Sequence, residues 1–315
     1  MTDLRIVFMG TPDFAVGILD ALCKKGYTIA GVITAPDRPA GRGRKLNQSA
    51  VKTYALAHGL KILQPTNLKH PEFLEQLKEL NANLQIVVAF RMLPKVVWQL
   101  PALGTFNLHA SLLPQYRGAA PINWAIMNGE TKTGTTTFFI DEKIDTGAII
   151  LQDELAISPS EDAGTLHDRL MHLGAKTVLK TVKRIEEGNL STYLQVDSAD
   201  LKLAHKLDRE TCRIDWTLPM ETIYNHIRGL SPYPAAWSTL IMNNDKLVVK
   251  IYKVEVEKIA HNIQPGKLIF DKKEIRVAVA GGYIKLLEIQ LQGKRRMTTE
   301  AVLNGLSLPE NAVFG

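Results

Sequence analysis

The chain is poor in cysteine and lacks any long hydrophobic segment. Its 315 residues contain two cysteines, Cys23 and Cys212, which lie far apart and outside any CxxC pair or Cys/His cluster. This spacing argues against a zinc site or a disulfide framework, so no metal is expected. No run of about 18 apolar residues occurs, and the N-terminus lacks the charged region and cleavage site of a secretory signal. We therefore expect a cytoplasmic protein without a membrane-spanning helix.

Two phosphate-binding motifs are also missing. Gly10, Thr11 and Pro12 follow the first apolar stretch, at the place where a dinucleotide-binding loop would lie. The pattern GxGxxG is absent there, and the P-loop pattern GxxxxGKS/T is absent as well. Nothing in the sequence therefore supports a bound nicotinamide or flavin dinucleotide.

Positive charge is concentrated in the last third of the chain. Of the net charge of +6, residues 202–315 account for +5, with 17 basic and 12 acidic residues. A basic module beside a nearly neutral one favours a polyanionic partner, of which nucleic acid is the commonest. Chance variation of surface charge is the alternative, because the excess is small.

Short apolar segments alternate with amphipathic ones through the first third of the chain. A helix is expected from Pro12 to about Gly26, with Thr11 as its N-cap and Asp13 in its first turn. Another helix is expected near residues 49–58. Strands are expected at residues 5–9, 28–33, 86–89 and 105–109. This alternation predicts an α/β domain with a mostly parallel sheet.

The pattern of expected secondary structure changes beyond about residue 205. Before it, strands at 135–140 and 148–152 flank an acidic loop, and a long helix is expected from 162 to 187. After it, short β-rich runs at residues 247–256, 266–270, 275–280 and 283–289 are separated by Asn-Asn, Lys-Lys and Gly-Gly pairs, which is typical of a small barrel or sandwich. We therefore expect two domains, residues 1–204 and residues 205–315.

Asn107 and His109 are candidate catalytic residues. They lie two residues apart at the end of an expected strand, so their side chains share one face. That is the end where open α/β sheets bind their ligands. An amide beside an imidazole can polarise a carbonyl and stabilise the oxyanion that forms when a nucleophile attacks it. The alternative is an asparagine that satisfies backbone groups and an ordinary histidine at a strand end.

Asp145 is the third candidate, in the loop 141–147 between two expected strands. A buried carboxylate there can keep His109 protonated as an acid. By itself, Asp-Thr-Gly between strands is more often a turn, and spacing alone does not establish that the two loops meet.

Several blocks of sequence resemble the folate-dependent formyltransferase family. They are residues 106–114, 117–121 and 144–147. Residues 10–15 and 36–43 resemble the branch of this family that formylates methionyl initiator tRNA. The order and spacing of the blocks match along residues 5–150.

The resemblance implies a Rossmann-like formyltransferase domain followed by an OB-like β-barrel that binds tRNA. It implies 10-formyltetrahydrofolate as the formyl donor and Asn107, His109 and Asp145 as the catalytic group. Phe90-Arg91-Met92 stands where many relatives carry a Tyr-Gly pair, a stretch that normally borders the pterin ring and here is closer to the purine-pathway enzymes. The residues expected to hold the folate are Phe90, Arg91, Leu93, Ser111, Leu112, Leu113, Pro114 and Asp141.

The loop at residues 36–46 favours tRNA independently of the resemblance. Its cations Arg38, Arg42, Arg44 and Lys45 are interleaved with glycines, which suits phosphates or unpaired bases at an acceptor end. The alternative is a solvated flexible loop. In the related enzymes the corresponding loop engages the acceptor stem, which implies the same role here.

The C-terminal module is expected to contact the tRNA backbone. The candidate cations are Lys246, Lys250, Lys272, Lys273, Lys294, Arg295 and Arg296. Residues 232–237 are rich in Pro and aromatic side chains, and they are expected to have a structural role by packing against the rest of the protein.

Two other functions stay open: formylation of a small amine, such as glycinamide ribonucleotide or an amino sugar, and a catalytically silent tRNA-binding protein. No coiled-coil pattern or apolar stripe occurs, so we expect a monomer.

Overall fold

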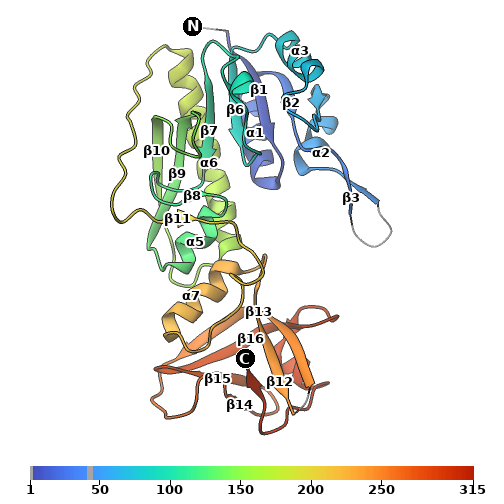
Figure 1. The fold of residues 1–315 in the computed structure, drawn as a ribbon, viewed down its shortest axis with the longest axis vertical. Helices are drawn as coiled ribbons and strands as arrows, with labels where there is room; N and C mark the ends of the chain where they lie inside the picture. The colour runs from blue at the N-terminus through green and yellow to red at the C-terminus, as the bar shows by residue number, and fades with distance from the viewer. Residues whose placement is uncertain (1–2, 41–44, 244) are drawn as a thin grey trace. The chain divides into compact units, whose positions relative to one another are not determined.

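The computed structural model describes residues 3–40, 45–243 and 245–315 (Figure 1). The chain folds into two compact units. The first contains the chain up to Gly118, residues 132–156 and residues 167–203; the second contains residues 119–131, 157–166 and 204–315. The chain passes from the first unit to the second for the last time between Leu203 and Ala204. Two earlier segments that join the second unit were not expected from the sequence, which indicated one boundary between residues 204 and 205.

The first unit is built on a seven-stranded sheet, in the order β10-β9-β7-β6-β1-β2-β5. Neighbouring strands from β7 to β5 pair in parallel, whereas β9 and β10 add an antiparallel edge. This confirms the predicted mostly parallel α/β sheet. The strands are β1 (Arg5–Gly10), β2 (Thr28–Ile33), β5 (Ile62–Leu63), β6 (Leu84–Val88), β7 (Thr105–His109), β9 (Lys132–Phe139) and β10 (Ile149–Ala156).

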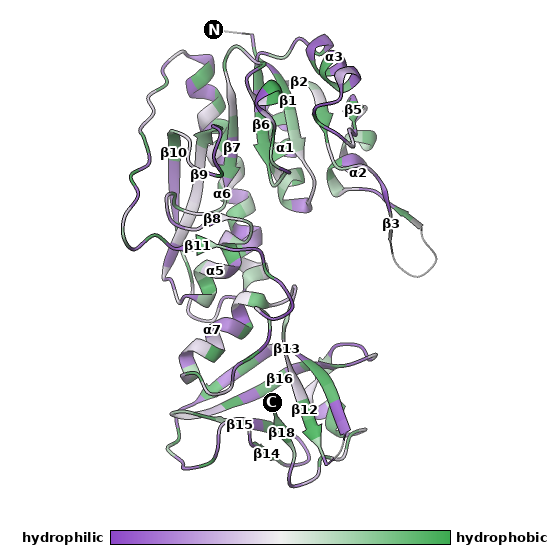
Figure 2. Ribbon diagram, in the orientation of Figure 1, coloured by the Kyte–Doolittle hydropathy of each residue, from purple (hydrophilic) through white to green (hydrophobic). Residues whose placement is uncertain are grey.

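Apolar residues on both faces of the central strands explain their position. Every residue of β6 is buried, which is the pattern of a strand covered by helices on both sides. Figure 2 shows hydrophobic residues along β1 and β6. Helix α1 (Asp13–Lys24) buries one face through Phe14, Ile18 and Leu22. Helix α6 (Ala163–Glu186) contacts β9 through hydrogen bonds between buried threonines, Thr177 to Thr135 and Thr181 to Thr137.

The first two helices differ in how their N-termini are capped. In α2 (Ala50–Ala57), the N-cap Ser49 accepts a hydrogen bond from the Lys52 amide at 3.0 Å. The predicted N-cap of α1 is wrong by one residue. Pro12 is the N-cap, and no side chain caps this helix. The remaining elements of this part of the chain are α3 (Pro71–Glu79), α4 (Lys95–Trp98), β3 (Arg38–Ala40), β4 (Lys45–Asn47), β8 (Arg117–Gly118) and β11 (Leu203–Ala204).

The second unit is a nearly closed antiparallel barrel. Its strands follow the order β14-β15-β16-β13-β12-β18, and a bridge between Lys267 and Val313 joins the two ends. Gly266 lies at this closure with φ of +86°, and a Cβ there would stand 2.5 Å from the Phe314 carbonyl oxygen. The strands are β12 (Ala236–Met242), β13 (Asp245–Glu257), β14 (Leu268–Phe270), β15 (Ile275–Val279), β16 (Gly282–Leu291), β17 (Met297–Thr298) and β18 (Val313–Phe314).

Three helices complete the second unit: α5 (Pro121–Met127), α7 (Met220–Leu230) and α8 (Thr299–Leu303). Met220, Ile223 and Ile227 of α7 belong to the same buried cluster as the inward residues of the barrel. Strand β12 was missed in the sequence because the prolines before it obscure its alternating pattern of buried and half-buried residues. Within the described ranges, no helix combines the length and the apolar character that crossing a membrane requires.

Candidate active site

Strand β7 carries Asn107 and His109 on one face at the carboxyl end of the sheet. Asn107 lies opposite Val87 on β6 and Phe138 on β9, and His109 lies opposite Thr136. His109 is buried, and Asn107 is half-buried. Among the described residues, none forms a hydrogen bond with the side-chain amide of Asn107, so the N–H groups of that side chain are available to a ligand.

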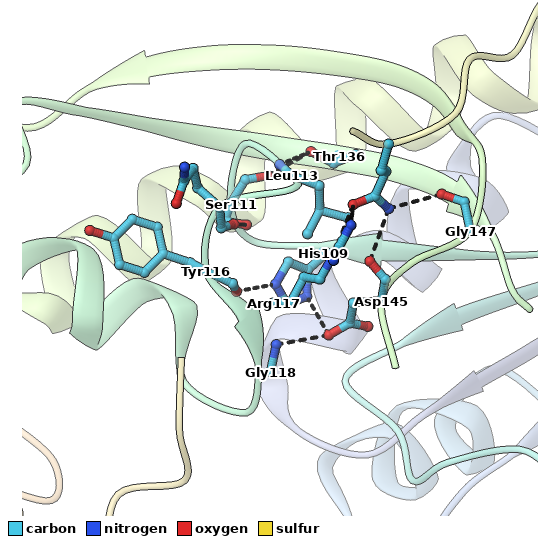
Figure 3. Close-up of polar contacts among 11 residues, drawn as sticks. His109, Ser111, Leu113, Tyr116, Arg117, Gly118, Thr136, Asp145 and Gly147 are labelled. Carbon is cyan, nitrogen blue, oxygen red and sulfur yellow. Dashed lines mark hydrogen bonds and ion pairs between the residues drawn. The ribbon is translucent and has the colours of Figure 1, made fainter. Parts of the chain in front are cut away.

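Both ring nitrogens of His109 face protein oxygens (Figure 3). Nε2 lies 2.8 Å from the Tyr116 carbonyl oxygen, and because a carbonyl only accepts, Nε2 carries the hydrogen. Nδ1 lies 3.8 Å from Oδ2 of Asp145. These two oxygens define the orientation of the ring, and a proton at Nδ1 lies beside the Asp145 carboxylate.

Asp145 is brought to His109 by the tight loop between β9 and β10. Its φ of +56° is in the left-handed region, which aspartate adopts more readily than most residues. Oδ2 accepts a hydrogen bond from the Gly118 amide at 2.9 Å (Figure 3). The loops that begin at Ala110 and at Asp141 therefore meet, which spacing in the sequence could not establish.

Gln195 was missed in the sequence, although it contacts both sides of this site. Its side-chain amide donates to the Asp145 and Gly147 carbonyl oxygens, each at 2.9 Å, and its Oε1 accepts from Arg117. Arg117 is buried and also pairs with Asp197 at 2.7 Å. Gln195 lies in an irregular stretch between α6 and β11, where no motif or periodicity singles it out.

The loop 111–114 is held by hydrogen bonds from its own Ser111 hydroxyl and from side chains of β9 and β10. The Ser111 hydroxyl donates to the Gln115 carbonyl oxygen at 2.7 Å, and Thr136 Oγ1 donates to the Ser111 carbonyl oxygen at 2.6 Å. Gln152 donates to the Leu113 carbonyl oxygen at 2.9 Å. Leu113 is buried, whereas Leu112 and Pro114 are half-buried. Ser111 and Leu113 therefore shape this loop, and a contact with folate stays a prediction for all four residues.

Three of the other expected folate residues follow strand β6. Arg91 and Leu93 line an open groove of about 750 Å³, and Phe90 is half-buried beside the core. The Arg91 guanidinium donates to the Thr66 carbonyl oxygen at 2.9 Å and to that of Pro65. Burial lowers the pKa of Arg91.

Asp141 acts within its own loop. Its carboxylate accepts from the Thr146 hydroxyl at 2.8 Å and from the Lys143 amide at 3.0 Å, which closes the turn that carries Asp145. Its expected contact with folate stays a prediction.

The basic loop begins and ends in a short hairpin of β3 and β4. Arg38 is exposed, lies opposite Asn47 and lines a cavity of about 370 Å³. Arg42 and Arg44 lie outside the described residues, and Lys45 begins β4.

Asp37 anchors the base of this hairpin. It accepts hydrogen bonds from Lys52 Nζ at 2.5 Å and from Gln64 Nε2 at 2.8 Å. The hydrogen bond from Lys52 is the main cause that lowers the pKa of the Asp37 carboxyl.

The cations of the C-terminal unit differ in their surroundings. Arg296 pairs with Glu288 and lies over the Tyr252 ring, so its charge is already partnered. Lys250 donates to the Pro234 carbonyl oxygen at 3.2 Å. Lys246, Lys272, Lys273, Lys294 and Arg295 are exposed.

Two further cations stack on one aromatic ring in this unit. Arg209 and Arg213 both lie over Trp237, at 4.9 and 5.8 Å from the ring centre. Across the part of the chain that the structure describes, no group of three or more His, Cys, Asp and Glu side chains is arranged to hold a metal ion.

Comparison with known proteins defines the class of this chain. The family model described as formyl transferase matches residues 4–182, and the model described as formyl transferase, C-terminal domain, matches residues 206–307. The chain belongs to the methionyl-tRNA formyltransferase family: it is 62% identical over 312 residues to that enzyme of Flavobacterium johnsoniae, covering 99% of each chain. It is 53% identical over 313 residues to the methionyl-tRNA formyltransferase of Bacteroides fragilis, covering 98% and 97%. The resemblance noted in the sequence is confirmed.

A solved structure shows the same fold. HypX from Aquifex aeolicus in complex with tetrahydrofolic acid matches with a TM-score of 0.66 at 17% identity, covering 96% of this chain and 47% of that one. At this identity the likeness concerns the fold alone.

Proposed function

We propose that this protein transfers a formyl group from 10-formyltetrahydrofolate to the amino group of methionyl initiator tRNA, as a monomeric cytoplasmic enzyme of translation initiation. The observation that carries the proposal is the 62% identity, along 99% of both chains, to a methionyl-tRNA formyltransferase. The juxtaposition of Asn107, His109 and Asp145 supports it, because these groups suit acyl transfer to an amine.

The groove beside Arg91 fits a folate in chemical character. Leu68, Leu74 and Leu93 line it with apolar surface, and Lys69 adds a cation at its wall, whereas Lys95 there pairs with Glu142. A flat aromatic ring system suits the leucines, and a carboxylate of a folate tail suits Lys69. Its volume of about 750 Å³ is in the range of pockets for small ligands.

The residues of the site divide the chemistry between them. Bound 10-formyltetrahydrofolate supplies the formyl group and the N10 leaving group. The methionyl amine attacks the formyl carbon and the new C–N bond forms. As negative charge develops on the formyl oxygen, the side-chain amide of Asn107 donates a hydrogen bond to it. One proton must leave this amine, and one must reach N10 as its bond to carbon breaks. The His109–Asp145 pair accepts the first proton at Nδ1 or the carboxylate and returns it to N10.

His109 contributes mainly through Nδ1 in this geometry. Its Nε2 hydrogen is engaged by the Tyr116 carbonyl oxygen, so the ring as it lies does not offer that hydrogen to the formyl oxygen. Stabilisation of the oxyanion, which the sequence assigned to Asn107 and His109 together, is here assigned to Asn107.

The proposal is tested by formyl transfer from 10-formyltetrahydrofolate to charged initiator tRNA. Elongator methionyl-tRNA and free methionine are assayed beside it. We expect activity with the initiator and far less with the other two, because the tRNA body is read. Activity on free amines would indicate a small-amine formyltransferase. Tight tRNA binding without turnover would indicate a silent binding protein, and either result would refute the proposal.

Arg42→Ala is expected to raise KM for tRNA about tenfold, the size of one lost hydrogen bond to a charged group. The prediction rests on its charge and its place in the basic loop. Affinity for the folate donor should stay unchanged, and the dependence of tRNA binding on salt should become shallower. Lys24→Ala is the matched control, since Lys24 is an exposed cation on α1 that pairs with Asp20. An equal effect of Arg42→Ala on folate and tRNA would contradict the assignment.

A further inference from the structure

We infer that Gln195 is a positioning residue that holds the Asp145 carboxylate beside His109, an inference that rests on the proposed function. Gln195 lies 50 residues after Asp145 in the chain and belongs to the same compact unit. Its contacts reach both the backbone that carries Asp145 and the strand that binds the Asp145 carboxylate.

The donor side of the Gln195 amide holds the backbone of the Asp145 loop. Nε2 lies 2.9 Å from the Asp145 carbonyl oxygen and 2.9 Å from the Gly147 carbonyl oxygen, so both of its hydrogens are used. The first of these carbonyls belongs to a residue with φ of +56°, an uncommon conformation for a residue other than glycine, and the hydrogen bond from Gln195 holds this part of the loop in place. Figure 3 shows the contacts at Asp145 and Gly147.

The acceptor side of the same amide holds strand β8. Oε1 accepts from Arg117 Nη2 at 2.7 Å and from Arg117 Nε at 3.0 Å. The next residue, Gly118, donates its amide hydrogen to Oδ2 of Asp145 at 2.9 Å. One side-chain amide therefore joins the backbone of Asp145 to the strand that orients its carboxylate.

Gln195 acts through Asp145, because its side-chain amide is occupied on both ends by Asp145, Gly147 and Arg117. Loss of its donor hydrogens would leave the loop joined to β8 through the Gly118–Asp145 hydrogen bond but without support for the Asp145 and Gly147 carbonyl oxygens, and would widen the distance of 3.8 Å between Asp145 Oδ2 and His109 Nδ1. Because catalysis is sensitive to displacements of about 1 Å, the consequence is a loss of rate and not of substrate binding.

Gln195→Glu separates this role from a merely structural one. Glutamate keeps the oxygens that accept from Arg117 but has no hydrogens for the Asp145 and Gly147 carbonyl oxygens. Gln195→Ala removes both sides. Gln115→Ala is the matched control. Gln115 also joins the loop after β7 to the 195–202 segment, through the Asp200 carbonyl oxygen and the Lys202 amide, without contacting Asp145.

We expect Gln195→Glu and Gln195→Ala to lower kcat about 10- to 100-fold. KM for tRNA and donor should change less than about threefold, since the residues expected to bind them keep their positions. Gln115→Ala should keep kcat within about threefold, since its contacts do not reach Asp145. Wild-type kcat in a folded Gln195→Glu protein would overturn the inference, as would equal losses in Gln195→Glu and Gln115→Ala.

Coupling to Asp145 gives a second readout. If Gln195 acts through Asp145, the double variant Gln195→Glu/Asp145→Asn should have a kcat less than about threefold below that of Asp145→Asn alone. If the two residues acted independently, the fold-losses in kcat of the two single variants would multiply. A crystal structure of Gln195→Glu should show Asp145 displaced from His109, and an unmoved Asp145 would overturn the inference. Absence of transfer by the wild-type protein would refute the proposed function instead, and the crystal structure would still decide the role of Gln195.

Discussion

Asp145→Asn is expected to lower kcat for formyl transfer about 30- to 1,000-fold, equivalent to about 2–4 kcal/mol in the activation barrier. The carboxylate has two tasks in the structure. It accepts from the Gly118 amide, and it places negative charge 3.8 Å from His109 Nδ1. Asparagine can keep the first contact through its own oxygen but not the charge. The loop should therefore stay in place while the proton transfers fail.

The measurement is kcat at saturating donor and methionyl-tRNA, with the thermal unfolding midpoint recorded for each variant. Glu142→Gln is the matched control, because it removes a charge from the same loop at an exposed residue that pairs with Lys95. Its kcat should stay near that of the wild type. Comparable rates for Asp145→Asn and the wild type would refute the catalytic role of Asp145.

His109→Ala should cost about as much as Asp145→Asn, since the two groups act on the same proton. The double variant should then be little slower than either single variant. Losses that multiply would show instead that Asp145 and His109 serve separate steps.

Gly147→Ala is expected to lower the free energy of unfolding of the first unit by about 3 kcal/mol, the upper end of the range for overpacking. A Cβ at this residue would lie 1.7 Å from the Phe139 carbonyl oxygen of β9. Rotation of a side chain does not relieve this overlap, because the obstacle is backbone. The loop must shift, and Asp145, two residues before Gly147, must shift with it. We therefore expect loss of formyl transfer in the protein that remains folded.

Urea unfolding followed by circular dichroism measures the first effect, and kcat of the folded fraction measures the second. Gly59→Ala is the control, because Gly59 has φ of +64° and a Cβ added there would meet no heavy atom within 4 Å. Gly59→Ala should lower the free energy of unfolding by about 1 kcal/mol, because alanine is strained at this positive φ. Equal losses in the two variants would show that the approach of Gly147 to Phe139 does not determine the stability of the loop.

Local pattern was sufficient for most of the first unit. Apolar runs indicated β1 and β6, and the apolar face of residues 13–24 indicated α1. These patterns are formed by residues that are neighbours in the chain, so they can be recognised without knowledge of the fold. The same locality placed Asn107 and His109 on one face, because a strand alternates its side chains with period two.

Two local features were misjudged in the sequence. Pro12 and not Thr11 is the N-cap of α1, and the prolines directly before β12 obscured that strand. The return of residues 119–131 and 157–166 to the second unit was not indicated, since it depends on packing against segments far along the chain.

The sequence by itself determined the class of fold and the family, and it supplied the residue types of the proposed catalytic group. Only the tertiary structure decided that Asp145 lies beside His109, that the Tyr116 carbonyl oxygen takes the Nε2 hydrogen, and that Gln195 joins the Asp145 loop to Arg117. The physical reason is that each of these contacts joins groups from different parts of the chain. Its distance is set by how the strands pair and how the loops cross, and neither composition nor spacing along the chain contains that information.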